Sequence, residues 1–66
     1  MIHWTFLIYM MTAAGWAPIE QVTVPGTVQD CLQTRREYQK KYALTGVHYM
    51  GECRPASIPN PEWPPR

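Results

Sequence analysis

The chain has 66 residues, a formal net charge of +1, and 17% charged against 45% hydrophobic residues. A chain of this length forms at most one small domain and buries only about 60% of the surface that its unfolded form exposes. The near-neutral charge argues against partners held by charge, so neither nucleic acid nor an anionic membrane surface is expected to bind.

The first element is the apolar segment IHWTFLIYMM, residues 2–11. No membrane span is expected here, because a helical span needs roughly 20 apolar residues. A secretion signal would suit the small residues that follow, but no Lys or Arg precedes Arg35, so the usual positive start is missing. Aromatic and β-branched residues favour a buried strand. Its alternation gives one wholly apolar face, made of Ile2, Trp4, Phe6, Ile8 and Met10.

Turn formers at Gly15 and Pro18 predict a turn, and residues 19–24 predict a second strand that forms a hairpin with the first. Thr27 and Asp30 have capping-box spacing, and Gly46 can end a helix, so a helix is predicted over residues 28–44. Arg35 and Gln39 interrupt its apolar stripe, which consists of Val28, Cys31, Leu32, Tyr38, Tyr42 and Ala43.

Residues 47–53 predict a third strand, with Val47, Tyr49 and Cys53 toward the helix and His48, Met50 and Glu52 away from it. A right-handed crossover then gives the strand order 2-1-3. The expected fold is α+β: a ββαβ domain over residues 1–53, with a three-stranded antiparallel sheet and one helix packed on one face. Five of the seven prolines follow in residues 54–66, which predict a proline-rich extended tail.

Cys31 and Cys53 are both expected to point into the interface between helix and sheet, with their Cα atoms within about 7 Å. A disulfide between them would stabilise the domain by about 3 kcal/mol. Two buried free thiols are the alternative, and the redox compartment decides between them.

This layout resembles small uncharacterised proteins of tailed phages, prophages and enterobacteria. The matching elements are IHWTFLIYMM, IEQVTVPGTVQDC and VHYMGEC, and the two cysteines are the anchor points. The chain departs from that pattern at Pro25-Gly26, in its Arg-, Lys- and Tyr-rich helix and in its tail. The resemblance implies a phage accessory protein that binds and inhibits a host protein, including a defence protein, in the host cytoplasm. It transfers no functional residue.

No catalytic or metal site is expected. The acidic residues lack the spacing of a catalytic pair, and His48 lies on the opposite face of its strand from Cys53. His3 and His48 face away from the cysteines, which argues against a zinc site. We therefore expect a non-enzymatic protein without cofactors.

Protein binding remains, and the sheet face away from the helix is the candidate surface. Three occupants are open: the tail, folding back with Ile58 and Trp63; a second copy, in a homodimer; and a foreign host protein. Trp63 also lies in a PxxPxR motif, residues 61–66, which is typical of polyproline ligands. The candidate partner-binding residues are His3, Thr5, Leu7, Tyr9, Met11, His48, Met50 and Trp63, beside Ile19 and Gln21.

Two functions follow from these patterns. The first is the cytoplasmic inhibitor of a host protein that the resemblance implies. The second is a small disulfide-stabilised structural or envelope protein of an oxidising compartment, either periplasmic or secreted. A stable Cys31–Cys53 bond favours the second, and two reactive thiols favour the first.

Overall fold

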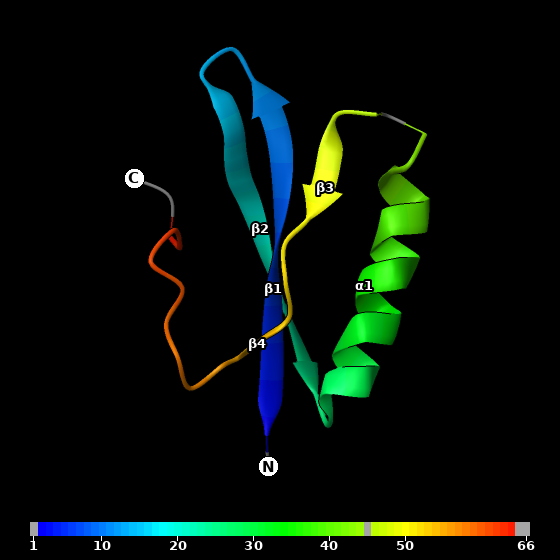
Figure 1. The fold of residues 1–66 in the computed structure, drawn as a ribbon, viewed down its shortest axis with the longest axis vertical. Helices are drawn as coiled ribbons and strands as arrows, with labels where there is room; N and C mark the ends of the chain where they lie inside the picture. Colours follow the sequence, from blue (N-terminus) through cyan, green and yellow to red (C-terminus); the bar gives the residue numbers. More distant parts are fainter. Residues whose placement is uncertain (1, 45, 65–66) are drawn as a thin grey trace.

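The computed structural model describes residues 2–44 and 46–64. Its elements in chain order are β1 (His3–Thr12), β2 (Gly15–Pro25), α1 (Val28–Tyr42), β3 (His48–Met50) and β4 (Arg54–Pro55). The sheet has the order β2-β1-β3, β4 also pairs with β1, and all these pairings are antiparallel. The predicted α+β class, ββαβ order and central first strand are confirmed. Figure 1 shows α1 on one side of the strands and the C-terminal segment on the other.

The β1–β2 hairpin is longer than predicted, because its turn lies at residues 13–14 rather than at Gly15 to Pro18. The Thr12 hydroxyl accepts a hydrogen bond from the Ala14 amide and donates one to the Gly15 carbonyl, at 3.2 and 2.6 Å. Gly15 itself has a φ of 112°, a conformation that glycine adopts without steric cost. Pro18 fits inside β2 because β2 is an edge strand, where the missing amide leaves no ladder bond unmade.

A β-bulge divides the hairpin into two registers. Ile8 lies opposite Glu20 and Tyr9 lies opposite Pro18, so Ile19 is an extra residue in β2. In an antiparallel pair, directly opposed residues place their side chains on the same face. The shift therefore sets Trp16 opposite Met11, on the face away from the helix. Without the bulge, Trp16 would lie on the helix side.

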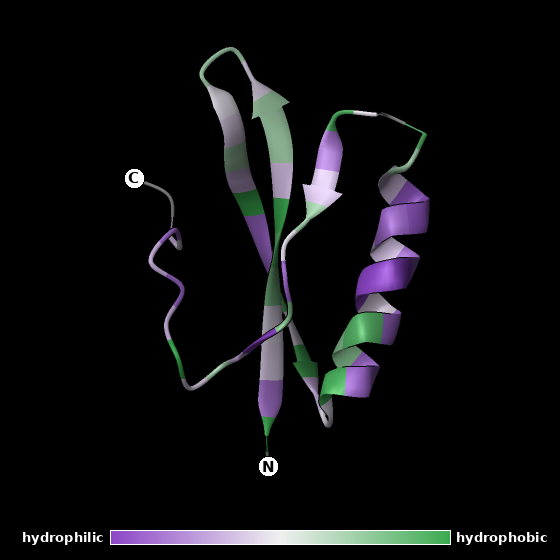
Figure 2. Ribbon diagram, viewed as in Figure 1, coloured by the Kyte–Doolittle hydropathy of each residue, from purple (hydrophilic) through white to green (hydrophobic). Residues whose placement is uncertain are grey.

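The helix begins at the predicted residue. Thr27 accepts from the Asp30 amide, and the Asp30 carboxylate accepts from the Thr27 amide, so the predicted capping box is confirmed. The helix ends at Tyr42, two residues before the predicted end, with Ala43 as its C-cap. Figure 2 shows hydrophobic residues in the first turns of α1 and a hydrophilic second half.

The core lies between α1 and the sheet and is small. Its buried members are Phe6, Ile8, Val24, Cys31 and Met50, with Trp4, Val22, Tyr38, Tyr42 and Cys53 packed around them. Phe6 meets the Tyr38 ring edge to face at a centroid distance of 5.7 Å. The predicted inward face of β1 is therefore confirmed, whereas Leu32, placed in the helix stripe, is 41% exposed.

The predicted faces of the third strand are wrong. Met50 lies opposite Ile8 and Tyr49 opposite Tyr9, so Met50 faces the helix and Tyr49 faces away from it. The cause is an extra residue in the stretch between Met50 and Arg54. Between the pair Ile8–Met50 and the pair Thr5–Arg54, three residues of this strand lie opposite only two of β1.

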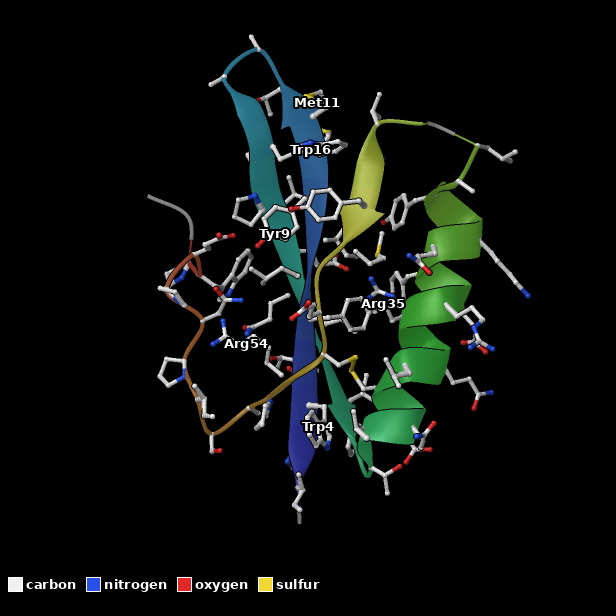
Figure 3. The ribbon with its side chains drawn as sticks, viewed as in Figure 1. Trp4, Tyr9, Met11, Trp16, Arg35 and Arg54 are labelled. Carbon is white, nitrogen blue, oxygen red and sulfur yellow. A yellow bond between two sulfur atoms is a disulfide. The ribbon has the colours of Figure 1, made fainter. Side chains whose placement is uncertain are left out.

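That irregular stretch, residues 51–53, explains why the cysteine prediction is still confirmed. The extra residue turns Cys53 back toward the helix, and Cys53 forms a disulfide with Cys31 at a Cα–Cα distance of 6.3 Å. Arg35, which interrupts the apolar stripe of α1, forms hydrogen bonds to the backbone at the start of this stretch. Its Nε and Nη2 donate to the Gly51 and Met50 carbonyls, at 2.7 and 3.1 Å. Figure 3 shows Arg35 extending from α1 toward the strands.

The extended tail begins two residues later than the proline content of the sequence predicts. Arg54 and Pro55, predicted to be tail residues, form β4 and pair with Thr5 and Trp4. The sheet pairing is extended by a hydrogen bond from the Ala56 amide to the His3 carbonyl. We call residues 56–64, the part of the chain that follows β4, the tail.

Candidate functional site

The sheet face opposite α1 is the candidate surface, and we call it the tail face. Four of the predicted β1 residues lie on it in alternate positions: Thr5, Leu7, Tyr9 and Met11. Their partners across the sheet share the face: Thr23, Gln21, Pro18 and Trp16 from β2, Tyr49 from β3 and Arg54 from β4. His3 belongs to the same alternation at the end of β1 and is exposed.

Two predicted residues are not on this face. Met50 is 2% exposed and belongs to the core. The His48 ring lies 4.6 Å from the Tyr42 ring of α1, which places it on the helix side. Both placements were wrong because the extra residue in residues 51–53 inverts the faces of β3. For the same reason Tyr49 was missed, although Gly51 inside a strand pattern is a signal for such a bulge.

The tail covers part of the tail face, around Leu7. Leu7 is 2% exposed and Thr5 is 8% exposed, yet neither belongs to the core cluster under α1. Asn60, Pro61 and Glu62 of the tail line one cleft together with Leu7, Tyr9 and Tyr49. The sequence allowed three occupants of this face: the tail, a second copy and a foreign protein. The tail is the one that covers the surface around Leu7.

The details of that contact differ from the prediction. Ile58, expected to cover the face, is 53% exposed. Trp63 is half-buried, and its amide donates to the Asn60 carbonyl within the tail. The end of the PxxPxR motif lies outside the described residues. Leu7, a candidate partner-binding residue, is buried, so a charge placed there would be desolvated.

Tyr9 joins the sheet to the tail. Its hydroxyl donates a hydrogen bond to the Glu62 carboxylate, across 53 positions of sequence. Burial, followed by this hydrogen bond and by the negative charge of Glu62, raises the pKa of Tyr9 well above its usual value. The Tyr9 hydroxyl therefore stays protonated at about pH 10, where an ordinary tyrosine ionises.

Beyond Tyr9 the tail face is uncovered and aromatic. The Tyr9 and Tyr49 rings are stacked at 4.6 Å, and the Trp16 ring meets Tyr49 edge to face at 4.7 Å. The Met11 amide donates to the Val47 carbonyl, which brings Val47 beside this group. Figure 3 shows Met11 and Trp16 together at the turn end of the hairpin.

We call the exposed members of this group the hairpin patch. Their exposed fractions are 47% for Met11, 45% for Trp16, 42% for Val47 and 41% for Tyr49. Of these, only Met11 was a predicted site residue. Trp16 was missed because residues 15–18 were predicted to form the turn, whereas Trp16 lies in β2 and the Ile19 bulge sets it on this face.

The outer side of α1 offers no comparable site. The hollow there is lined by residues of one helix alone, among them Gln33, Glu37 and Lys40, so no second element opposes them.

The described chain shows neither a metal centre nor a spanning helix. Residues 2–44 and 46–64 contain no group of three or more His, Cys, Asp or Glu placed to hold a metal ion. Within the same residues, no helix has the length and apolar character needed to cross a membrane. Comparison with protein-family models, curated proteins and solved structures finds no match for this chain.

Proposed function

We propose that this chain is a small non-enzymatic protein-binding module and that the hairpin patch is its contact surface. One observation carries the proposal: Met11, Trp16, Val47 and Tyr49 expose apolar side chains side by side at one end of a sheet face. Trp, Tyr and Met are enriched in protein interfaces, and Trp and Tyr are frequent hot spots.

The rigidity of the patch supports the same function. Trp16 lies on β2 and Tyr49 lies on β3, and both strands pair with β1. The two rings also contact each other, so their orientation is set before a partner arrives. Little side-chain entropy is then lost on binding. The tail covers the neighbouring part of the tail face around Leu7, so the partner is expected to contact the hairpin patch first.

The biological setting of the module is also a proposal. The resemblance to phage proteins supports a role as an accessory protein that binds and inhibits a host protein. The disulfide is compatible with an oxidising compartment, and this observation favours the second candidate, a disulfide-stabilised structural or envelope protein that is periplasmic or secreted. Free-thiol counting on protein from its native host distinguishes the two.

The test of the proposed function uses Trp16→Ser with Leu32→Ser as its matched control. Leu32 has a similar exposed fraction, 41% against 45%, but lies on α1. A partner captured from host extract is purified, and its Kd is measured for the parent and both variants. We expect Trp16→Ser to weaken binding by about 30-fold, as for an interface hot spot, and Leu32→Ser to leave it unchanged.

Two results would contradict the proposal. Equal affinity of both variants for the purified partner would remove the hairpin patch from the interface. A stable homodimer in sedimentation experiments that Trp16→Ser dissociates would identify the occupant of the patch as a second copy instead of a foreign protein.

A further inference from the structure

None of residues 56–64 belongs to a strand. The tail bonds to the sheet through the Ala56 amide, which donates to the His3 carbonyl, and further along through the side chains of Tyr9 and Glu62. Its internal bonds are local turns: the Trp63 amide donates to the Asn60 carbonyl, and the Glu62 amide donates to the Asn60 side chain. Prolines at 59, 61 and 64 restrict the backbone further. A segment of this kind is preorganised and leaves little entropy to lose when it docks.

Two aromatic side chains, Tyr9 and Tyr49, line the cleft beside the tail. Tyr9 is stacked on Tyr49, and a Cβ built on Gly51 would lie only 3.2 Å from the Tyr9 ring. Glycine at 51 therefore lets the Tyr9 ring lie close over the strand. Pro61 lines the same cleft as these two rings, and aromatic-lined grooves are the surfaces that proline-rich peptides bind.

The sheet side of this cleft carries three polar or charged side chains: Tyr9, Glu52 and Arg54. The Tyr9 hydroxyl donates to the Glu62 carboxylate, the residue that directly follows Pro61. Tyrosine is protonated at physiological pH, so this donor is available to a ligand. Arg54 lines the same cleft and places a positive charge beside an acidic ligand; Figure 3 shows its side chain directed toward the tail.

From this arrangement we infer that the sheet side of the cleft is a docking site for a proline-rich peptide with an acidic residue after proline, and that the tail, which forms the other wall of the cleft, is docked there as an intramolecular ligand. The inference rests on the proposed function and names the partner's segment: an extended Pro-Glu or Pro-Asp sequence that replaces the tail while the partner's body contacts the hairpin patch.

The inference has a quantitative consequence. A ligand joined through a short linker has an effective concentration on the order of 1 mM. The tail remains docked only if the intrinsic Kd of the site is below that value. For an intrinsic Kd of about 0.1 mM, the docked tail weakens binding of an added peptide about tenfold, and releasing the tail restores it.

The experiment uses the full chain and a fluorescent peptide, ASIPNPEWP, equal to residues 56–64. In the full chain, Glu62→Lys removes the carboxylate that Tyr9 binds and leaves the sheet unchanged. Glu37→Lys, an exposed position of α1, is the matched control for the charge change. Fluorescence anisotropy measures the Kd of the peptide for the parent and both variants.

We expect the peptide to bind the Glu62→Lys chain about tenfold tighter than the parent or the Glu37→Lys chain. A peptide carrying Glu62→Gln should bind that chain several-fold more weakly, which tests the hydrogen bond without altering the protein. Adding Tyr9→Phe to the Glu62→Lys chain should produce the same loss for the unmodified peptide. Thermal melting verifies that each variant is folded.

Equal peptide affinity for the Glu62→Lys and parent chains would overturn the inference. So would tighter binding that a scrambled peptide reproduces, because the cleft would then have no sequence preference. These failures are separable from failure of the proposed function. If Trp16→Ser abolishes partner binding while the peptide does not bind, the patch functions without the cleft.

Discussion

Removing the Cys31–Cys53 disulfide should cost this domain a large share of its stability. The bond joins residues 22 positions apart, and the chain-entropy relation for such a loop gives about 3 kcal/mol. A chain of 66 residues is expected to have about 3 to 10 kcal/mol of unfolding free energy in total. The loss corresponds to a fall in Tm of roughly 12 to 24 °C.

The perturbation is made in two ways. Cys31 is fully buried, so the parent is unfolded, reduced with a phosphine and refolded before measurement. The double variant Cys31→Ala, Cys53→Ala removes both thiols without burying a new polar group. Thermal melting followed by circular dichroism then compares the oxidised parent, the reduced parent and the double variant.

We expect the reduced parent and the double variant to melt at similar temperatures, both far below the oxidised parent. The double variant should not respond to reductant, which controls for effects of the phosphine itself. If reduction lowers the Tm of the parent by less than about 3 °C, the loop-closure argument is refuted. The bond would then contribute little to the fold, and its bearing on the compartment would weaken.

The remaining predictions concern the core, the bulge and the tail. Phe6→Ala should destabilise the fold by about 3 to 5 kcal/mol in denaturant titration, because Phe6 is 1% exposed; an unchanged midpoint would mean that the inward face is misassigned. Arg35→Met should cost about 2 kcal/mol, because it loses its bonds to the carbonyls of residues 50 and 51, whereas exposed Arg36→Met should cost less than about 0.5 kcal/mol; equal costs would contradict this role. The raised pKa of Tyr9 means that its contribution to tail docking is complete below about pH 10 and is lost as the pH rises through the folded-state pKa. Tyrosinate absorbance should show a late titration step that Tyr9→Phe removes, and persistence of that step in the variant would contradict the buried contact.

Sequence patterns predicted those elements that are determined by residues close together in the chain. The alternation of residues 2–11 identified the inward face of β1, because a strand reverses its side chains at every residue. The Thr27–Asp30 capping box identified the helix start, because both partners lie within one turn. The cysteine pair was predicted for a less local reason. Cys31 and Cys53 were both predicted to face the interface between helix and sheet, and the extra residue within residues 51–53 keeps Cys53 on that side.

Features that depend on pairing between distant strands were not predictable in the same way. An extra residue within residues 51–53 inverted His48 and Met50, and the Ile19 bulge moved Trp16 to the tail face. A one-residue slip reverses every following side chain in a strand, so a single bulge is enough to reassign a surface.

The position of the tail was decided by tertiary structure alone. Its docking depends on Tyr9 and Glu62, which are 53 positions apart, and no local propensity relates them. Local sequence patterns identified most of the extended segments, the start of the helix and the apolar face of β1, but they placed a turn at residues 15–18 and assigned β4 to the tail. The tertiary structure decided which aromatic residues are exposed, because exposure depends on strand register and on what a distant segment covers.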